Sequence, residues 1–213
     1  MHLHSVIISF NRLELLKQCY HSYKETVSVP HTLVIVDNRS DNHTRQWLSA
    51  EVSTRDQVIF LEHNRFPGYA CNRGWEVMPP ETTFLHRSDN DFAFLSGWCE
   101  NFLAKFRDVR CGQVGLRTSR EEMGATSNVG GNNVIRRQLW DEGLRYDERP
   151  WGSDYPPGWT EDSLFTPAVT KMGYGWKRVA KPSIVSLSRE DPDDPYYQET
   201  WRLRGITPPS SNP

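Results

Sequence analysis

Short runs of apolar residues alternate with segments of helical periodicity along the first 90 residues. The run at 4–9, HSVIIS, is rich in β-branched residues and predicts a strand. In the following segment, 12–25, apolar residues recur at positions 13, 15, 16, 19, 20 and 23, which is close to the helical period. The pattern therefore predicts a strand followed directly by a helix.

The same alternation continues to residue 88. Strands are predicted over 32–38, 57–64 and 82–88, and helices over 44–52 and 68–78. The segment TLVIVDN at 32–38 is almost entirely apolar, as is typical of a strand buried on both faces of a parallel sheet. Strand and helix alternate at about 30 residues per unit, which predicts an α/β fold with a mostly parallel, doubly wound sheet and right-handed crossovers.

The pattern becomes irregular beyond residue 115. A Gly/Asn-rich turn precedes an apolar and basic segment within 123–144, and a loop rich in Pro, Gly and aromatic residues follows at 146–159. A helix is predicted to begin after Thr160 as N-cap, to be interrupted by Pro167 and to end near Gly173. A final strand is predicted within 177–188, and 191–213 is predicted to be a mobile tail.

Length and composition fit one globular domain. The chain has 213 residues, of which 37% are hydrophobic and 24% charged. It contains no run of about 20 apolar residues, and its first residues are too polar for a signal peptide, so we expect a cytoplasmic protein without a membrane span. The four cysteines are widely spaced without a C-x-x-C pair, which favours reduced, buried thiols.

The charge limits the choice of partners. A net charge of -2 argues against a protein that binds nucleic acid over its whole surface, but it leaves room for a local basic groove. Arginine supplies 19 of the 25 basic residues. Its guanidinium can hold phosphate in a bidentate geometry, although a bias in composition explains the excess equally well.

Polar residues follow several predicted strands at their carboxyl ends, where doubly wound sheets bind ligands. Asp89 and Asp91 form a D-x-D pattern after the strand at 82–88. Carboxylate oxygens at this place can hold Mg²⁺ or Mn²⁺ against a diphosphate. The alternative is a turn or helix cap, for which the same residue types are common.

Two further acidic positions are open to functional and structural interpretations. Asp37, with Asn38 and Ser40 nearby, can accept hydrogen bonds from a base or ribose, or can form an Asx-turn. Glu161 and Asp162 stand at the start of a predicted helix, where the helix dipole favours carboxylates, so they can act as caps.

Taken in order, these segments resemble the family 2 type of glycosyltransferase with the GT-A fold, and the resemblance covers about residues 5 to 188. It is carried by SVIISFNRLELLKQC, LVIVDNRSDNHTRQWL, NRFPGYACNRGWE, FLHRSDND, GGNNVIRRQLWDEGLRYDER and WTEDSLFTPAVTKMGY. The resemblance implies one GT-A domain over 1–200, with a nucleotide-sugar half at 1–115, an acceptor half at 116–200 and a tail at 201–213.

The resemblance also implies roles for individual residues. Nucleotide contacts fall to Ser9, Phe10, Asn11, Arg12, Asp37, Asn38, Asn72 and Asp89. Asp89 and Asp91 would hold Mn²⁺ or Mg²⁺, Asp162 would be the general base beside Glu161, and Gly131, Asn132, Asn133 and Trp159 would line the donor sugar or acceptor. The implied reaction inverts the anomeric centre and uses a nucleotide sugar of the UDP type.

The sequence departs from the family at two places. His86 and Arg87 in HRSDND stand where many relatives begin an acidic run, and PSIVSLSRE offers only serines where many GT-A enzymes place a histidine ligand. A nucleotide-binding GT-A module without turnover is therefore the main alternative, although the E-D pair argues for an enzyme. A nucleotidyltransferase would need a Gly-rich basic loop, which SFNRLE lacks.

The acceptor stays open at this stage. The resemblance is compatible with a saccharide, a lipid-linked sugar, a protein or a hydroxymethylated base in DNA. The sequence leaves the oligomeric state open as well.

Overall fold

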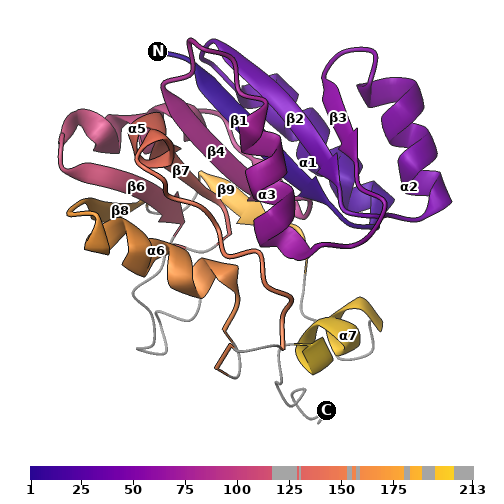
Figure 1. Cartoon of the computed structure of the whole chain (residues 1–213). Coiled ribbons are helices and arrows are strands. Elements are labelled where there is room, and N and C mark those ends of the chain that lie inside the picture. The colour runs from indigo at the N-terminus through magenta and orange to yellow at the C-terminus, as the bar shows by residue number, and fades with distance from the viewer. Residues whose placement is uncertain are drawn as a thin grey trace, which may run out of the picture.

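The computed structural model describes residues 1–116, 129, 131–152, 155–156, 159–179, 183–188 and 195–203. Within them, seven strands form one sheet in the order β3-β2-β1-β4-β7-β6-β8 (Figure 1). These strands are β1 (Leu3–Ser9), β2 (His31–Asp37), β3 (Gln57–Phe60), β4 (Phe84–Asp89), β6 (Cys111–Leu116), β7 (Asn133–Arg136) and β8 (Gly175–Val179). Only β7 runs antiparallel to its neighbours, so the predicted mostly parallel α/β sheet is confirmed.

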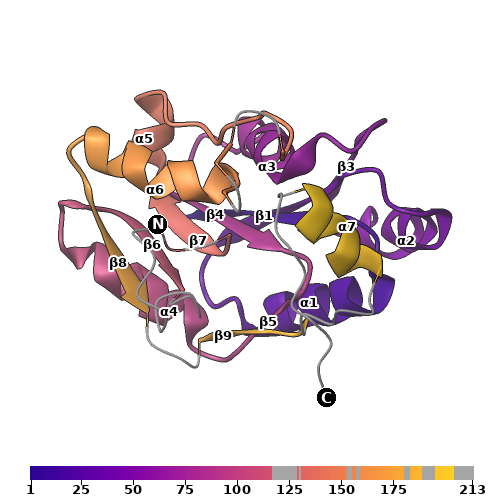
Figure 2. The ribbon, with the colours of Figure 1, turned by 90° about the horizontal axis from the view of Figure 1, so that it is seen from below.

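Helices cover both faces of the sheet, as Figure 2 shows. The face with α3 (Phe66–Glu76), α5 (Arg137–Asp141) and α6 (Glu161–Lys171) has its own apolar core, which includes Trp75 and Phe165. The other face is covered by α1 (Leu13–Thr26), α4 (Trp98–Leu103) and a small sheet of β5 (Phe92–Phe94) and β9 (Ile184–Ser186). At the β3 edge, α2 (Asn42–Trp47) continues into a π-helical turn (Leu48–Val52).

The strand register brings the polar strand ends together. Every residue of β1 is buried, as expected for a central strand, and β1 pairs with β2 and β4. Ser9 is opposite Asp37 in this register, and Ile8 is opposite Asp89. The chain order reverses at β1, because β2 lies on one side and β4 on the other, which makes this edge the expected ligand site of the sheet.

Of two predictions about the helix that follows Thr160, one is confirmed and one is wrong. Thr160 is the N-cap of α6, and its backbone N–H donates to Ser163 Oγ at 3.3 Å. The predicted interruption at Pro167 is wrong, because α6 continues through it to Lys171. Phe165 and Val169 are buried on either side of Pro167, and their packing offsets the backbone hydrogen bond that proline cannot make.

The final strand and the tail also differ from prediction. The described part of 177–188 divides between β8 and β9, which lie in different sheets, and 180–182 lie outside the described residues. The segment interpreted as a mobile tail contains α7 (Pro195–Leu203), with Tyr197 and Trp201 buried. The two aromatic side chains lie on one helical face and have apolar surface to bury. Residues 204–213 lie outside the described part.

Several elements between residues 92 and 144 carried too weak a pattern for prediction. Residues 92–116, for which the sequence pattern predicts no element, form β5, α4, a short 3₁₀ turn (Ala104–Arg107) and β6. The predicted apolar and basic segment forms β7 and α5, whereas most of the Gly/Asn-rich turn lies outside the described residues. All four cysteines are free and buried, in agreement with the expectation from their spacing.

Candidate active site

The loops that leave β1 and β2 are tied to each other. Asn11 and Arg12 both have positive φ, 53° and 58°, a conformation that non-glycine residues adopt at some cost. The Asn11 backbone N–H donates to Ser40 Oγ at 2.8 Å, and Asn11 Oδ1 accepts from the Asp41 N–H at 2.7 Å. Asn38 donates its backbone N–H to the Ser9 carbonyl at 2.7 Å. The two loops that carry Asn11 and Asn38, which are predicted nucleotide residues, are thus joined by hydrogen bonds and present one polar surface at Asn11.

Asp37 lies beneath this surface. Its carboxylate is fully buried, accepts the Ser40 N–H at 3.2 Å and lies 3.6 Å from the Arg45 guanidinium. Burial raises the pKa of Asp37, partly offset by the hydrogen bonds from Ser40. These contacts match the turn interpretation of Asp37, and its contact with a nucleotide stays a prediction.

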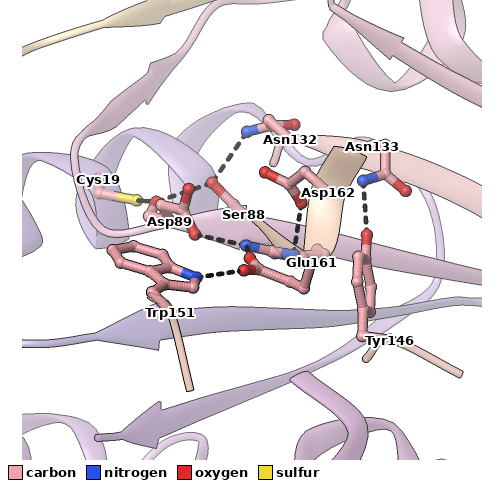
Figure 3. Close-up of polar contacts among 10 residues, drawn as sticks. Cys19, Ser88, Asp89, Asn132, Asn133, Tyr146, Trp151, Glu161 and Asp162 are labelled. Atoms are coloured by element: carbon pink, nitrogen blue, oxygen red, sulfur yellow. Dashed lines mark hydrogen bonds and ion pairs between the residues drawn. The ribbon is translucent and has the colours of Figure 1, made fainter. Parts of the chain in front are cut away.

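A second cluster lies at the end of β4, where Arg87 contacts three carboxylates. The Arg87 side chain is 1% exposed, and its Nη1 donates to Asp162 Oδ1 at 2.7 Å. Its Nη2 donates to Glu161 Oε1 at 2.7 Å and to Asp89 Oδ1 at 3.3 Å. Figure 3 shows Asp89, Glu161 and Asp162 around these contacts. Residues separated by more than 70 positions therefore meet where β4 ends and α6 begins.

The charges in this cluster influence one another strongly. Burial raises the pKa of Asp89 to about 6, although the neighbouring Arg87 acts in the opposite direction. Burial alone would lower the pKa of Arg87, but Asp162, Asp89 and Glu161 together raise it well above its ordinary value. Arg87 is therefore a permanent positive charge among the acids.

The second acid of the D-x-D pattern has different partners. Asp91 Oδ2 lies 3.3 Å from Arg12 Nη1 and accepts from Ser188 Oγ at 2.7 Å. Ser188 belongs to the serine-containing segment that departs from the family pattern. Ser188 thus contacts Asp91, a predicted metal ligand, and the spacing in the sequence could not show this contact.

Gly131 lies close to both the Asp89 and the Asp162 carboxylates. A Cβ at this position would lie 2.6 Å from Asp89 Oδ2 and 3.1 Å from Asp162 Oδ2. Real Cβ atoms do not approach oxygen as closely as the first distance. Two carboxylate oxygens thus converge beside Gly131, and the space at Gly131 is too narrow for a larger side chain unless an acid moves.

The predicted asparagines near this space are buried. Asn132 Oδ1 lies 3.2 Å from His86 Nε2, and Asn132 Nδ2 donates to Ser88 Oγ at 2.9 Å. Asn133 Nδ2 donates to Tyr146 Oη at 2.8 Å. Asn72 Nδ2 donates to the Tyr146 carbonyl at 2.9 Å and equally to Glu148. In this conformation the three amides form hydrogen bonds with neighbouring protein groups. Their contacts with donor or acceptor stay predictions.

Two tryptophans precede Glu161 in the chain, and Trp151 contacts it. Trp151 Nε1 donates to Glu161 Oε2 at 2.7 Å, as Figure 3 shows, and the Trp151 ring lies 5.7 Å from Phe66. Trp159 is 42% exposed, which leaves its ring available for stacking on a sugar. Trp98, by contrast, is a buried core residue.

Asp89 and Asp91 fit a divalent cation that takes its remaining ligands from elsewhere. Among the described residues, no group of three or more His, Cys, Asp or Glu side chains is arranged to hold a metal. Each of the two aspartates uses one oxygen in its ion pair with arginine and has a second carboxylate oxygen. Mg²⁺-type sites commonly use one or two carboxylates together with phosphate oxygens.

Comparison with known proteins identifies the class. The family described as glycosyl transferase family 2 matches residues 5–160, and the chain belongs to this family. The expected GT-A glycosyltransferase fold is confirmed by solved structures. A mannosyltransferase, PcManGT from Pyrobaculum calidifontis in complex with GDP-Man and Mn²⁺, superposes with a TM-score of 0.72 at 16% identity, covering 95% of this chain and 60% of that one.

A second similar structure is TarS 1-349 of S. aureus in complex with UDP-GlcNAc. It has a TM-score of 0.68 at 17% identity, and the match covers 95% of this chain and 65% of the TarS chain. The present chain thus spans about 60% of the length of these structures. No curated protein matches the sequence significantly. None of the helices in the described residues is long and apolar enough to cross a membrane.

Proposed function

We propose that this chain transfers a sugar from a nucleotide-sugar donor to an acceptor hydroxyl with inversion, and that Asp162 is the general base. The observation that carries the proposal is the convergence of Asp89 and Asp162 on the space at Gly131. One carboxylate comes from the nucleotide side of the sheet and the other from the first turn of α6. We therefore assign the meeting point of donor and acceptor to the region between these two acids.

The contacts of the two adjacent acids favour Asp162 as base. Both oxygens of Glu161 are engaged, by Arg87 and by Trp151, and its side chain is 2% exposed. Asp162 is 20% exposed, and its Oδ2 lies toward Gly131. A base must reach the acceptor hydroxyl to remove its proton during attack. Glu161 serves instead to hold Arg87 and Trp151 in place.

The nucleotide would lie over the loops that follow β1 and β2. We assign contacts there to Ser9, Phe10, Asn11, Arg12, Asp37 and Asn38, with Asn72 behind them and Asp89 at the diphosphate. Asp89 and Asp91 would hold Mn²⁺ or Mg²⁺, which when bound neutralises charge on the departing diphosphate. Support comes from the complexes of PcManGT with GDP-Man and Mn²⁺ and of TarS with UDP-GlcNAc.

The acceptor would approach from the side of α6. Trp159 offers an exposed ring, and Gly131, with Asn132 and Asn133 behind it, lines the space between the acids. We propose a saccharide hydroxyl as acceptor, with a hydroxymethylated DNA base as the second candidate.

The test is an assay of nucleotide release from UDP-, GDP- and dTDP-sugars, with and without Mn²⁺, followed by a screen of saccharides and hydroxymethylated DNA. Transfer with inverted anomeric configuration, read by NMR of the product, would support the proposal. A chain that binds nucleotide but releases none with any donor and acceptor would be a binding module. Product with retained configuration would contradict the proposed single displacement.

A further inference from the structure

Arg87 is the least expected feature of the site. It stands in HRSDND, two residues before Asp89, so its side chain leaves β4 on the same face as that of Asp89. The guanidinium is buried, lies 4.6 Å above the Tyr146 ring and contacts Asp89, Glu161 and Asp162. In the sequence, Arg87 is recognisable only as a residue that displaces an acid of the family pattern.

Stability alone is a weak reason for this arrangement. Removing an arginine and carboxylates from water costs several kcal/mol per ion, and well-packed apolar side chains often replace a buried ion pair without loss. The position of the guanidinium is set by its two terminal nitrogens, since Nε has no hydrogen-bond partner among the described residues. The contacts made by those nitrogens join two elements, β4 and α6.

We propose that Arg87 is a positioning residue for the transfer reaction: its guanidinium holds the base Asp162 and the donor-side Asp89 at a defined separation across Gly131. The proposal rests on the function proposed above. Nη1 fixes Asp162 Oδ1, so that Oδ2 lies toward the space at Gly131. Nη2 fixes Asp89 Oδ1, and Asp89 Oδ2 lies toward the same space.

Lysine cannot reproduce this geometry. A guanidinium is a planar fork whose separate nitrogens hold separate carboxylates, whereas an ammonium is a single point charge on a flexible chain. The Tyr146 ring packs against the guanidinium, and Asn133 and Phe165 contact Tyr146 in turn. Arg87→Lys therefore keeps the charge but releases the fixed separation of the acids.

The experiment combines Arg87→Lys with Asp162→Asn in a double-mutant cycle. We expect Arg87→Lys to lower kcat by about 10- to 100-fold, the scale of a misplaced catalytic group. The Kd for a nucleoside diphosphate measured without a divalent cation should change by less than about threefold, because Arg87 does not contact the loops after β1 and β2 and the cation held by Asp89 is absent from this measurement. In the Asp162→Asn background, Arg87→Lys should lower kcat by at least about threefold less than it does in the wild-type background, because one of the two acids that Arg87 positions no longer acts as a base.

A matched control is Arg136→Lys. Arg136 also lies over an aromatic ring, at 5.2 Å from Phe106, but its guanidinium holds the carbonyls of Phe106, Asp108 and Cys111. Arg136→Lys should lower the melting temperature and leave kcat unchanged. If Arg87→Lys unfolds near the assay temperature, Arg87→Gln combined with Glu161→Gln removes one charge of each sign and is measured in the same cycle.

The outcomes are distinct. Independent, multiplying effects of Arg87→Lys and Asp162→Asn on kcat would overturn the positioning role while leaving the proposed function in place. A parallel loss of melting temperature, nucleotide affinity and kcat, as for a structural residue, would overturn it too. An inactive wild-type chain would overturn the proposed function and this proposal together.

Discussion

At the scale of single residues, the adjacent acids Glu161 and Asp162 differ in exposure and in partners. Glu161 is enclosed by Arg87 and Trp151, whereas Asp162 borders the space at Gly131. This difference separates a supporting acid from a candidate base, although both carry the same functional group.

Asp162→Asn should lower transfer by about 10²- to 10⁴-fold, the usual contribution of a general base, because it preserves size and removes the proton acceptor. Nucleotide affinity should persist. Glu161→Gln should have a milder effect on kcat and a larger one on melting temperature, since it weakens a buried ion pair. Turnover at saturating donor and acceptor, with nucleotide affinity by calorimetry, decides between them. Wild-type turnover by Asp162→Asn would shift the assignment of the base to Glu161.

Gly131→Ala should reduce transfer by at least about tenfold with little loss of stability. The new methyl group would displace the Asp89 and Asp162 carboxylates by steric overlap. Gly175→Ala is the matched control, because its Cβ would meet only the Arg110 carbonyl at an ordinary 3.5 Å. Steady-state kinetics and thermal melting of both variants provide the check, and equal kcat values for the two would argue that the space at Gly131 is not used.

At the scale of elements, β4 carries both the site and the buried network behind it. His86 lies 3.1 Å from Ser5 Oγ and 3.2 Å from Asn132 Oδ1, and Asn132 in turn contacts Ser88. Ser88 donates to the Asp89 carbonyl at 2.9 Å. The end of β4 is therefore held by buried polar contacts, which suits a strand that must present an acid in a defined position.

Burial lowers the pKa of His86 to about 4, against an ordinary value of 6.5. Between these two pKa values the unfolded chain therefore binds more protons than the folded chain does. The free energy of unfolding falls as the pH falls through this window. The histidine should remove about 3 kcal/mol of unfolding free energy between pH 7 and pH 4. His86→Gln should flatten this part of the profile in urea titrations at several pH values. An unchanged slope in the variant would show that other groups cause the acid sensitivity.

At the scale of the whole molecule, α7 returns the end of the described chain to the loop that follows β1. It lies beyond the carboxyl ends of the central strands (Figures 1 and 2), and the Arg12 guanidinium lies 5.3 Å from the Tyr197 ring. A Cβ on Gly152 would lie 2.5 Å from the Leu203 carbonyl, so α7 also meets the loop that carries Trp151. α7 thus contacts both the loop that carries Arg12 and the loop that carries Trp151.

Trp201→Ala should destabilise the fold by about 3 kcal/mol, at the lower end for a buried tryptophan because α7 lies at the periphery. It should also weaken nucleotide affinity, because the Arg12 loop loses the packing of α7. Val109→Ala, at a side chain that is 79% exposed, provides a control. Denaturation and calorimetry measure the two effects. Full nucleotide affinity in a destabilised Trp201→Ala variant would separate α7 from the donor site.

The sequence by itself determined the order of strands and helices to residue 88, the acids at strand ends and the Thr160 cap. These features depend on periodicity and short-range hydrogen bonding, which neighbouring residues encode. Tertiary structure alone decided that Arg87 holds Asp89, Glu161 and Asp162, that Ser188 meets Asp91, and that α7 is folded. Those contacts join residues far apart in the chain, and their formation depends on how β4, α6 and β9 pack around the sheet.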